Sequence, residues 1–195
     1  MSQILGFVNQ KGGVGKTTST INVARYLAEF GKRVLLVDLD PQGNASSGLG
    51  IEKEGIEKNL YHAMIMGAPP QEIIYATDTE GLHIIPAAQD LAGAEIEMIH
   101  LDGREFRLHN VLRVLRPHYD YILIDSPPSL GLLTINGLVA SDGVIVPVQT
   151  EYYALEGLSQ LLGTIDLVRE RLQPELKIFG ALLTLYDRRN RLARQ

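Results

Sequence analysis

Residues 4–19 read ILGFVNQKGGVGKTTS, an apolar run followed at once by a segment with three glycines and two lysines. Its end, Gly15-Lys16-Thr17, fits the close of the phosphate-binding pattern G-x-x-x-x-G-K-[ST], in which a glycine-rich loop joins a strand to a helix. The first glycine of that pattern should stand where this sequence has Gln10, and Lys11 follows it. The loop therefore carries a second lysine that the ordinary pattern does not explain.

Further apolar runs along the chain lack the alternation of a strand with one wet face, and such runs are typical of strands buried on both faces. Segments with helical spacing lie between them, so the sequence predicts an α/β protein with a mostly parallel, doubly wound sheet and helices on both faces. The predicted strands are residues 4–8, 34–37, 82–85, 121–124, 144–148 and 178–183. The predicted helices are residues 17–30, 59–66, 106–115 and 154–172, with Gly31 as the cap of the first.

The composition limits the class of protein. The 195 residues suit one domain spanning 1–195, and 45% hydrophobic with 21% charged residues is an ordinary globular balance. The chain has no cysteine, which excludes disulfides and cysteine-ligated iron–sulfur clusters. A net charge of -5 argues against a surface that binds nucleic acid everywhere, although a local basic patch remains open. Neither a signal peptide nor a long apolar run is recognisable, so we expect a cytoplasmic protein.

Polar segments follow four of the predicted strands. Because the carboxyl ends of parallel strands meet at one edge of a sheet, we expect these segments to form one ligand-binding rim. They are NQKGGVGKTT after the first strand, residues 38–44 (DLDPQGN) after the second, residues 125–129 (DSPPS) after the fourth and residues 149–153 (QTEYY) after the fifth.

The residues of this rim have the chemistry of a nucleotide site. Glycines let successive backbone N–H groups turn toward phosphate oxygens, and the following helix adds its positive end. Lys16 is placed to reach the β- and γ-phosphates, and the Thr17 hydroxyl to bind Mg²⁺. Asp125, which ends an apolar strand, matches an aspartate that holds Mg²⁺ in such proteins. Asp40 precedes a proline, so a simple turn role stays open for it.

The motifs resemble those of the ParA/MinD family of P-loop ATPases, whose phosphate loop departs from the ordinary pattern in the same way. The segment Lys11-Gly-Gly-Val-Gly-Lys-Thr17 is similar to the family's deviant Walker A motif. Residues 38–44, 125–130 and 151–157 resemble the chromosomal ParA branch, often called Soj, and the similarity covers the whole chain. The resemblance implies a SIMIBI-type P-loop NTPase fold.

The same resemblance implies roles for the rim residues. Lys11 is the family's signature lysine, which reaches the nucleotide of the other subunit in an ATP-bound sandwich dimer, while Lys16 acts within its own subunit. Asp40 lies in a switch loop and helps to position the attacking water, and Thr17 and Asp125 hold Mg²⁺. The implied catalytic residues are Lys11, Lys16 and Asp40. The implied ATP-binding residues are Lys11, Gly12, Gly13, Val14, Gly15, Lys16, Thr17 and Thr18.

The last ten residues contain four arginines in an otherwise acidic chain. Such a cluster suits phosphate backbones, although a solvated helix face also explains it. The resemblance favours DNA, because Arg189 matches an arginine with which relatives bind DNA without sequence preference, and it implies Arg189 and Arg188 as the DNA-binding residues. Chains of this family continue beyond this point, so we expect that the C-terminal part is missing here.

The resemblance thus implies an Mg²⁺-dependent ATPase for chromosome or plasmid partition, located in the cytoplasm on the nucleoid. Its expected partners are a second copy of the chain, non-specific double-stranded DNA and a ParB-type protein that stimulates hydrolysis, with no membrane. The alternative is a membrane-associated positioning ATPase similar to MinD. A metabolic P-loop ligase or kinase is a more distant reading, and the lack of cysteine removes an iron–sulfur protein similar to nitrogenase iron protein.

Overall fold

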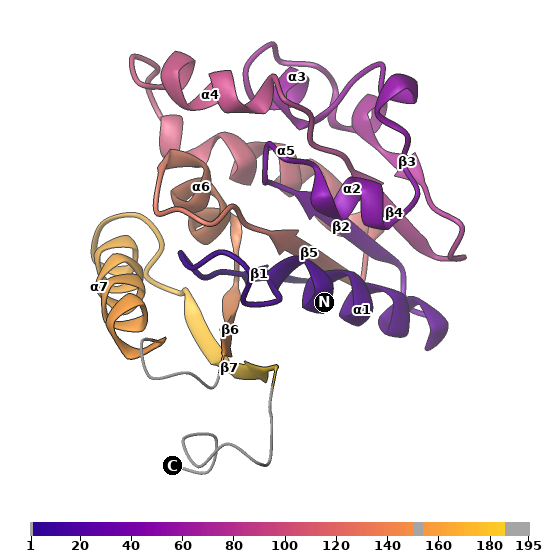
Figure 1. Cartoon of the computed structure of the whole chain (residues 1–195). Coiled ribbons are helices and arrows are strands. Elements are labelled where there is room, and N and C mark those ends of the chain that lie inside the picture. The colour runs from indigo at the N-terminus through magenta and orange to yellow at the C-terminus, as the bar shows by residue number, and fades with distance from the viewer. Residues whose placement is uncertain (1, 150–153, 186–195) are drawn as a thin grey trace.

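The computed structural model describes residues 2–149 and 154–185, and Figure 1 shows how their elements are arranged. The strands are β1 (Gln3–Phe7), β2 (Val34–Asp38), β3 (Tyr75–Ala76), β4 (Leu82–Ile85), β5 (Tyr121–Asp125), β6 (Gly143–Gln149) and β7 (Lys177–Thr184). The α-helices are α1 (Lys16–Glu29), α2 (Asn44–Gly48), α3 (Leu60–Met64), α4 (Leu91–Met98), α5 (Arg107–Leu115), α6 (Leu132–Ala140) and α7 (Ala154–Arg171). Short 3-10 helices are η1 (Lys53–Gly55), η2 (Pro70–Ile73), η3 (Arg104–Phe106) and η4 (Arg116–His118).

The strands form one sheet in the order β3-β4-β2-β5-β1-β6-β7. Every neighbouring pair is parallel except β3 and β4, which run antiparallel. The strand order reverses at β1. The chain first builds the sheet on one side of β1 with β2, β3 and β4, then places β5 between β2 and β1, and finally adds β6 and β7 on the other side of β1. The predicted mostly parallel, doubly wound sheet is confirmed, and ligands of such sheets bind where the strand order reverses.

Helices cover both faces of the sheet, as predicted (Figure 1). Successive side chains of a strand point to opposite faces, and on β2 Leu36 packs toward α1 and α2 while Leu35 packs toward α3, α4, α5 and α6. Val8 lies on the same face as Ile4. It belongs to a third cluster of buried residues, which α6, β6 and α7 contribute. On both faces of the sheet the core consists mainly of buried aliphatic residues, which explains the continuous apolar runs of the central strands.

Each predicted strand lies within one residue of an observed strand at both ends. Helix α1 begins directly after Gly15 and buries Thr20, Ala24 and Ala28, a stripe with the helical spacing of four. It ends as the sequence predicts, because Gly31 adopts a φ of 75° and its N–H donates to the carbonyl of Ala28. This left-handed turn is easy only for glycine.

Two features differ from the sequence-based expectation. The run 178–183 forms β7 but is exposed along most of its length, with Phe179 at 51% and Leu183 at 58% exposure. Among the described residues β7 pairs only with β6, so it is the edge strand at this end of the sheet, and most of its side chains are left exposed. Strand β3 and three helices were also not predicted. These helices are α2, which is very short, and α4 and α6, which are apolar on most sides.

Candidate nucleotide-binding site

The carboxyl ends of β1, β2 and β5 meet at one edge of the sheet. Asp125, the last residue of β5, lies in register with Phe7 on one side and with Asp38 on the other. The loops that follow these three strands therefore converge, and they enclose a cavity of about 670 Å³, a size typical of small-molecule sites. The lining residues are Gly12, Gly13, Gly15, Lys16, Thr17, Thr18, Ser19, Asp40, Asn44, Pro128, Thr184 and Leu185.

Backbone conformation shapes the glycine-rich loop into a cradle. Gly13 and Gly15 have φ values of 74° and 83°, in the left-handed region that side-chain-bearing residues rarely adopt. A Cβ atom at Gly13 would meet nothing within 4 Å, and one at Gly12 would meet only Pro128 at 3.9 Å. Gly12 and Gly13 thus have open space beside them and line the cavity, and Gly15 turns the chain into the N-terminus of α1. This geometry suits a phosphate chain.

Two strands far away in the sequence brace this loop. The Thr184 hydroxyl of β7 donates to the carbonyl of Val14 at 2.7 Å, and the Gln149 amide of β6 donates to the carbonyl of Gly13 at 3.3 Å. At the entrance to the loop, the Asn9 amide donates to the carbonyl of Pro147 at 2.7 Å. Asn9 and Gln149 belong to segments that the sequence places at the rim, but Thr184 and the bonds themselves were not predicted, because no short motif links positions more than 130 residues apart.

The two lysines occupy different places in the loop. Lys16 is 6% exposed, and its ammonium donates to the carbonyl of Lys11 at 3.1 Å. Burial lowers the pKa of Lys16, against the opposing effect of the Asp125 and Asp40 carboxylates. Lys11 is only half-buried, and its backbone N–H donates to the Asn9 side chain. Lys16 therefore lies inside the cradle and lines the cavity, whereas Lys11 is not among the lining residues.

Asp125 lies beneath the loop with no exposed surface. Burial raises its pKa to about 7, although hydrogen bonding with Thr17 and the charge of Lys16 act in the opposite direction. One carboxylate oxygen, Oδ1, accepts a bond from the Thr20 hydroxyl at 3.3 Å, while the buried Oδ2 has no hydrogen-bond partner in the described part of the chain.

This donor set fits Mg²⁺. A buried carboxylate oxygen without a partner, next to the hydroxyl of Thr17, provides the hard oxygen ligands that the ion prefers. Within residues 2–149 and 154–185, no three His, Asp or Glu side chains gather into a cation site of their own. Thr17 and Asp125 would therefore hold Mg²⁺ together with phosphate oxygens and water, the usual arrangement for nucleotide-bound magnesium.

Asp40 reaches the cavity from the loop after β2. It is 7% exposed, and its carboxylate accepts a bond from the N–H of Gln42 at 3.0 Å. The neighbouring Asp38 is fully buried, and burial raises its pKa to about 6. The structure thus brings the predicted residues 11–18, Asp40 and Asp125 together, whereas Arg188 and Arg189 lie outside the described residues.

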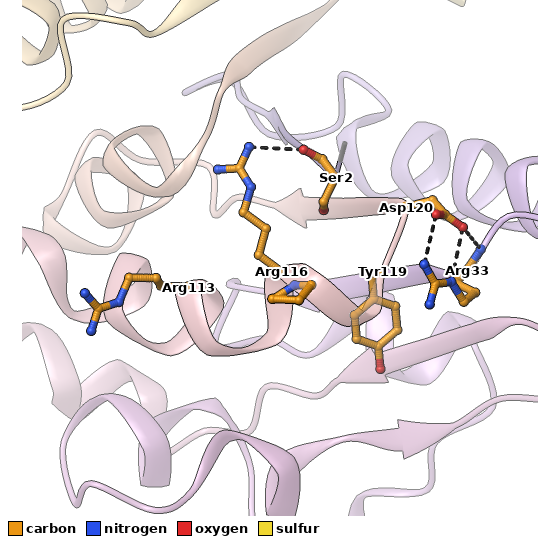
Figure 2. Close-up of a pocket in the computed structure, with 7 residues that line it drawn as sticks. Ser2, Arg33, Arg113, Arg116, Tyr119 and Asp120 are labelled. Carbon is orange, nitrogen blue, oxygen red and sulfur yellow. Dashed lines mark hydrogen bonds and ion pairs between the residues drawn. The ribbon is translucent and has the colours of Figure 1, made fainter.

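A second hollow, shown in Figure 2, lies at the opposite end of the strands and contains three arginines. Two of them are already neutralised by carboxylates. Arg33 bonds Asp120 through two side-chain nitrogens, and Arg116 bonds both carboxylate oxygens of Asp142. These pairs leave little positive charge for a ligand, so the sheet edge with the glycine-rich loop is the candidate site.

A parallel sheet whose first strand and first helix are joined by a glycine-rich loop ending in Gly15-Lys16-Thr17 defines a P-loop nucleotide-binding protein. A family model described as "AAA domain" matches residues 2–178. The chain is 56% identical over 195 residues to the sporulation initiation inhibitor protein Soj of Bacillus subtilis, a match that covers all of this chain and 77% of that protein. It is 54% identical over 195 residues to the chromosome partitioning protein ParA of Myxococcus xanthus, a match that covers all of this chain and 69% of that protein.

Solved structures agree with this assignment. A cobyrinic acid a,c-diamide synthase from Mycobacterium smegmatis with bound ATP analogue and magnesium superposes with a TM-score of 0.95 at 43% identity, over 100% of this chain and 79% of that one. A plasmid partition protein from Borrelia burgdorferi gives 0.87 at 32% identity, over 99% and 82%. The chain belongs to the ParA/Soj family of P-loop ATPases, which use ATP and Mg²⁺. In the described residues, no helix has the length and apolarity to span a membrane.

Proposed function

We propose that this protein is an ATP-dependent switch for chromosome or plasmid partition. The observation that carries the proposal is the cavity at the rim, in which Lys16, Asp40 and the glycine-rich loop face one space above Asp125. Membership of the ParA/Soj family supports the same function. ATP binding would convert a monomer into a sandwich dimer that binds DNA in the cytoplasm, on the nucleoid, and hydrolysis stimulated by a ParB-type protein would release it.

Within one subunit, each rim residue has a defined task. The loop N–H groups and Lys16 would bind the β- and γ-phosphates, and Thr17 and Asp125 would hold Mg²⁺, which when bound would supply positive charge beside the phosphates. Asp40 accepts a hydrogen bond from the attacking water and orients it toward the γ-phosphate. Asp40 is 7% exposed and lines the same cavity as Lys16, so its carboxylate lies beside the proposed phosphate site.

Lys11 would link nucleotide binding to dimerisation. Lys11 precedes the glycines of the loop and is not among the residues that line the cavity with Lys16. In a face-to-face dimer it would approach the phosphates of the second subunit and add a cation that only association supplies. Such a contribution resembles an arginine finger, which stabilises the charge of phosphoryl transfer from outside the site.

The experiment measures phosphate release and sedimentation with ATP and Mg²⁺, using wild type and Lys16→Ala. We expect slow turnover and an ATP-dependent dimer for wild type, stimulation by duplex DNA together with a ParB-type protein, and neither activity in Lys16→Ala. A wild-type protein that stays monomeric with ATP and ignores both macromolecules would contradict the proposal.

A ligase is the competing function, since a solved structure of 43% identity carries the name cobyrinic acid a,c-diamide synthase. The two functions differ in what limits turnover. A ligase hydrolyses ATP only while it couples an acceptor and an amide donor, whereas a partition ATPase needs neither. Adding cobyrinic acid and glutamine should leave the rate of phosphate release unchanged, and a rate that depends on them would favour the ligase.

A further inference from the structure

A buried hydrogen-bond network lies directly behind the Asp40 loop. Asp38, the last residue of β2, has no exposed surface, and its carboxylate accepts three hydrogen bonds. Oδ2 accepts from the N–H of Ser46 at 2.8 Å and from its hydroxyl at 2.7 Å, and Oδ1 accepts from the N–H of Asp40 at 3.3 Å. Asp38 therefore contacts the backbone of the residue proposed to position water.

Ser46 connects the network to a third segment. It lies in α2 and is 1% exposed, and its hydroxyl both donates to Asp38 and accepts from the N–H of Ala87 at 3.2 Å. Ala87 follows β4, the neighbour of β2 in the sheet. One hydroxyl thus ties the end of β2, the start of α2 and the connection after β4 to each other.

The network closes the loop that carries Asp40. Residues 39–45 run between two points, Asp38 and Ser46, that are hydrogen-bonded to each other. Inside the loop, the N–H of Gly43 donates to the carbonyl of Asp40 at 2.9 Å, and the Asp40 carboxylate accepts from Gln42. The network thus holds the loop backbone at both ends, and the bond from Gln42 holds the Asp40 carboxylate. A catalytic group needs such support, because a displacement of about 1 Å can reduce a rate by roughly 100-fold.

We propose that Asp38 and Ser46 are positioning residues that hold the Asp40 carboxylate in its hydrolytic orientation. This inference rests on the proposed function, since it gives the Asp40 loop its task. It differs from an ordinary stabilising role in one respect. A network that only stabilises the fold would change the melting temperature, whereas a positioning network changes turnover at an unchanged affinity for nucleotide and acts only through Asp40.

The test compares Ser46→Ala with Ser47→Ala, an exposed serine at the next position of α2. Turnover, the Kd for ATP and the melting temperature are measured for each variant. Ser46→Ala should lower kcat by about tenfold while the Kd for ATP stays within about twofold. Ser47→Ala should match wild type, and Ser46→Thr, which keeps the hydroxyl, should retain most of the turnover. A folded Ser46→Ala protein with wild-type kcat would overturn the proposal.

A double-mutant cycle with Asp40→Ala separates this inference from the proposed function. If Ser46 acts through Asp40, Ser46→Ala should cost no further turnover in the Asp40→Ala background, and additive losses would overturn the inference. Wild-type turnover in Asp40→Ala alone would instead reject the proposed role of Asp40. Should Ser46→Ala fail to fold, Asp38→Asn, which keeps the size of the side chain, is measured in the same cycle with the same two outcomes.

Discussion

At the scale of single residues, the two loop lysines differ in surroundings although they belong to one motif. Lys16 is buried near two carboxylates at the start of α1, whereas Lys11 is only half-buried and does not line the cavity. A buried ammonium beside acidic groups is held in place before any ligand arrives, so it suits binding within the subunit. A lysine at the rim can extend to a second molecule through its long side chain.

Substitution of each lysine should therefore have a different effect. Lys16→Ala removes the cation inside the cradle and should abolish ATP binding. Lys11→Ala leaves the cradle intact, so it should keep most of the affinity for ATP but lose the ATP-dependent dimer and turnover. Equilibrium titration with ATP and analytical ultracentrifugation test both expectations. Equal affinity of Lys16→Ala and wild type would disprove its role within the subunit.

Gly12 offers a second test of the dimer. A Cβ atom there would find only Pro128, at an ordinary contact distance of 3.9 Å, so the monomer has room for a side chain. If two loops face each other, that space belongs to the second subunit. Gly12→Val should therefore fold and bind ATP yet remain monomeric with ATP, with Gly12→Ala weaker in effect. A normal ATP-dependent dimer of Gly12→Val in sedimentation would contradict the packing argument.

At the scale of elements, short helices and connections near the site are held by tertiary contacts. Helix α2 has five residues, too few for an isolated helix to be stable, and its Ser46 bonds to Asp38. Helix α5, by contrast, buries one regular stripe of four residues, Leu108, Val111, Leu112 and Leu115. The regular spacing of these apolar residues made α5 predictable from sequence. Their burial is also the contribution of the helix to the stability of the fold.

Truncation on α5 should depend on the face of the helix. Leu112→Ala removes a fully buried side chain and should lower the free energy of unfolding by about 2–5 kcal/mol. Val114→Ala, two positions away and 43% exposed, should change it by less than about 1 kcal/mol. Denaturant titration of both variants measures the difference. Equal losses would show that α5 does not pack as described.

At the scale of the whole molecule, charge and assembly are linked. The chain carries a net charge of -5, so DNA would be attracted by a local cluster and repelled by much of the remaining surface. A dimer doubles such a cluster on one particle, and the second contact then becomes effectively intramolecular. ATP could therefore control DNA binding without contacting the DNA-binding residues.

The arginines near the C-terminus provide the corresponding prediction. Arg189→Ala should weaken binding to two unrelated duplexes equally, because contacts to phosphates carry no sequence information. It should also reduce the log–log salt slope by about 0.9 for each phosphate that the protein no longer neutralises. Binding of both proteins is measured across a salt series with ATP and with ADP. Unchanged affinity, or a salt-insensitive preference for one duplex, would reject the phosphate contact and favour the alternative that these arginines form a solvated helix face.

Much of the candidate site could be predicted from sequence, because local chain order carries its chemistry. The loop 9–18 is one continuous segment, and Asp40 and Asp125 each follow a continuous apolar strand that parallel pairing brings to the same edge. What could not be predicted rests on long-range contacts. Thr184 supports Val14 across 170 positions, and the hydroxyl of Ser46 reaches Ala87 across 41.

The amino-acid sequence by itself determined the parallel sheet, the nucleotide loop and the acidic residues beside it, because hydrophobic periodicity and short motifs act between near neighbours in the chain. Only the tertiary structure decided that β7 is an exposed strand that braces the loop, and that Asp38 and Ser46 lie behind Asp40 as a buried network. The physical reason is that burial and hydrogen-bond partners depend on which distant segments pack together, and neither is recorded in local residue order.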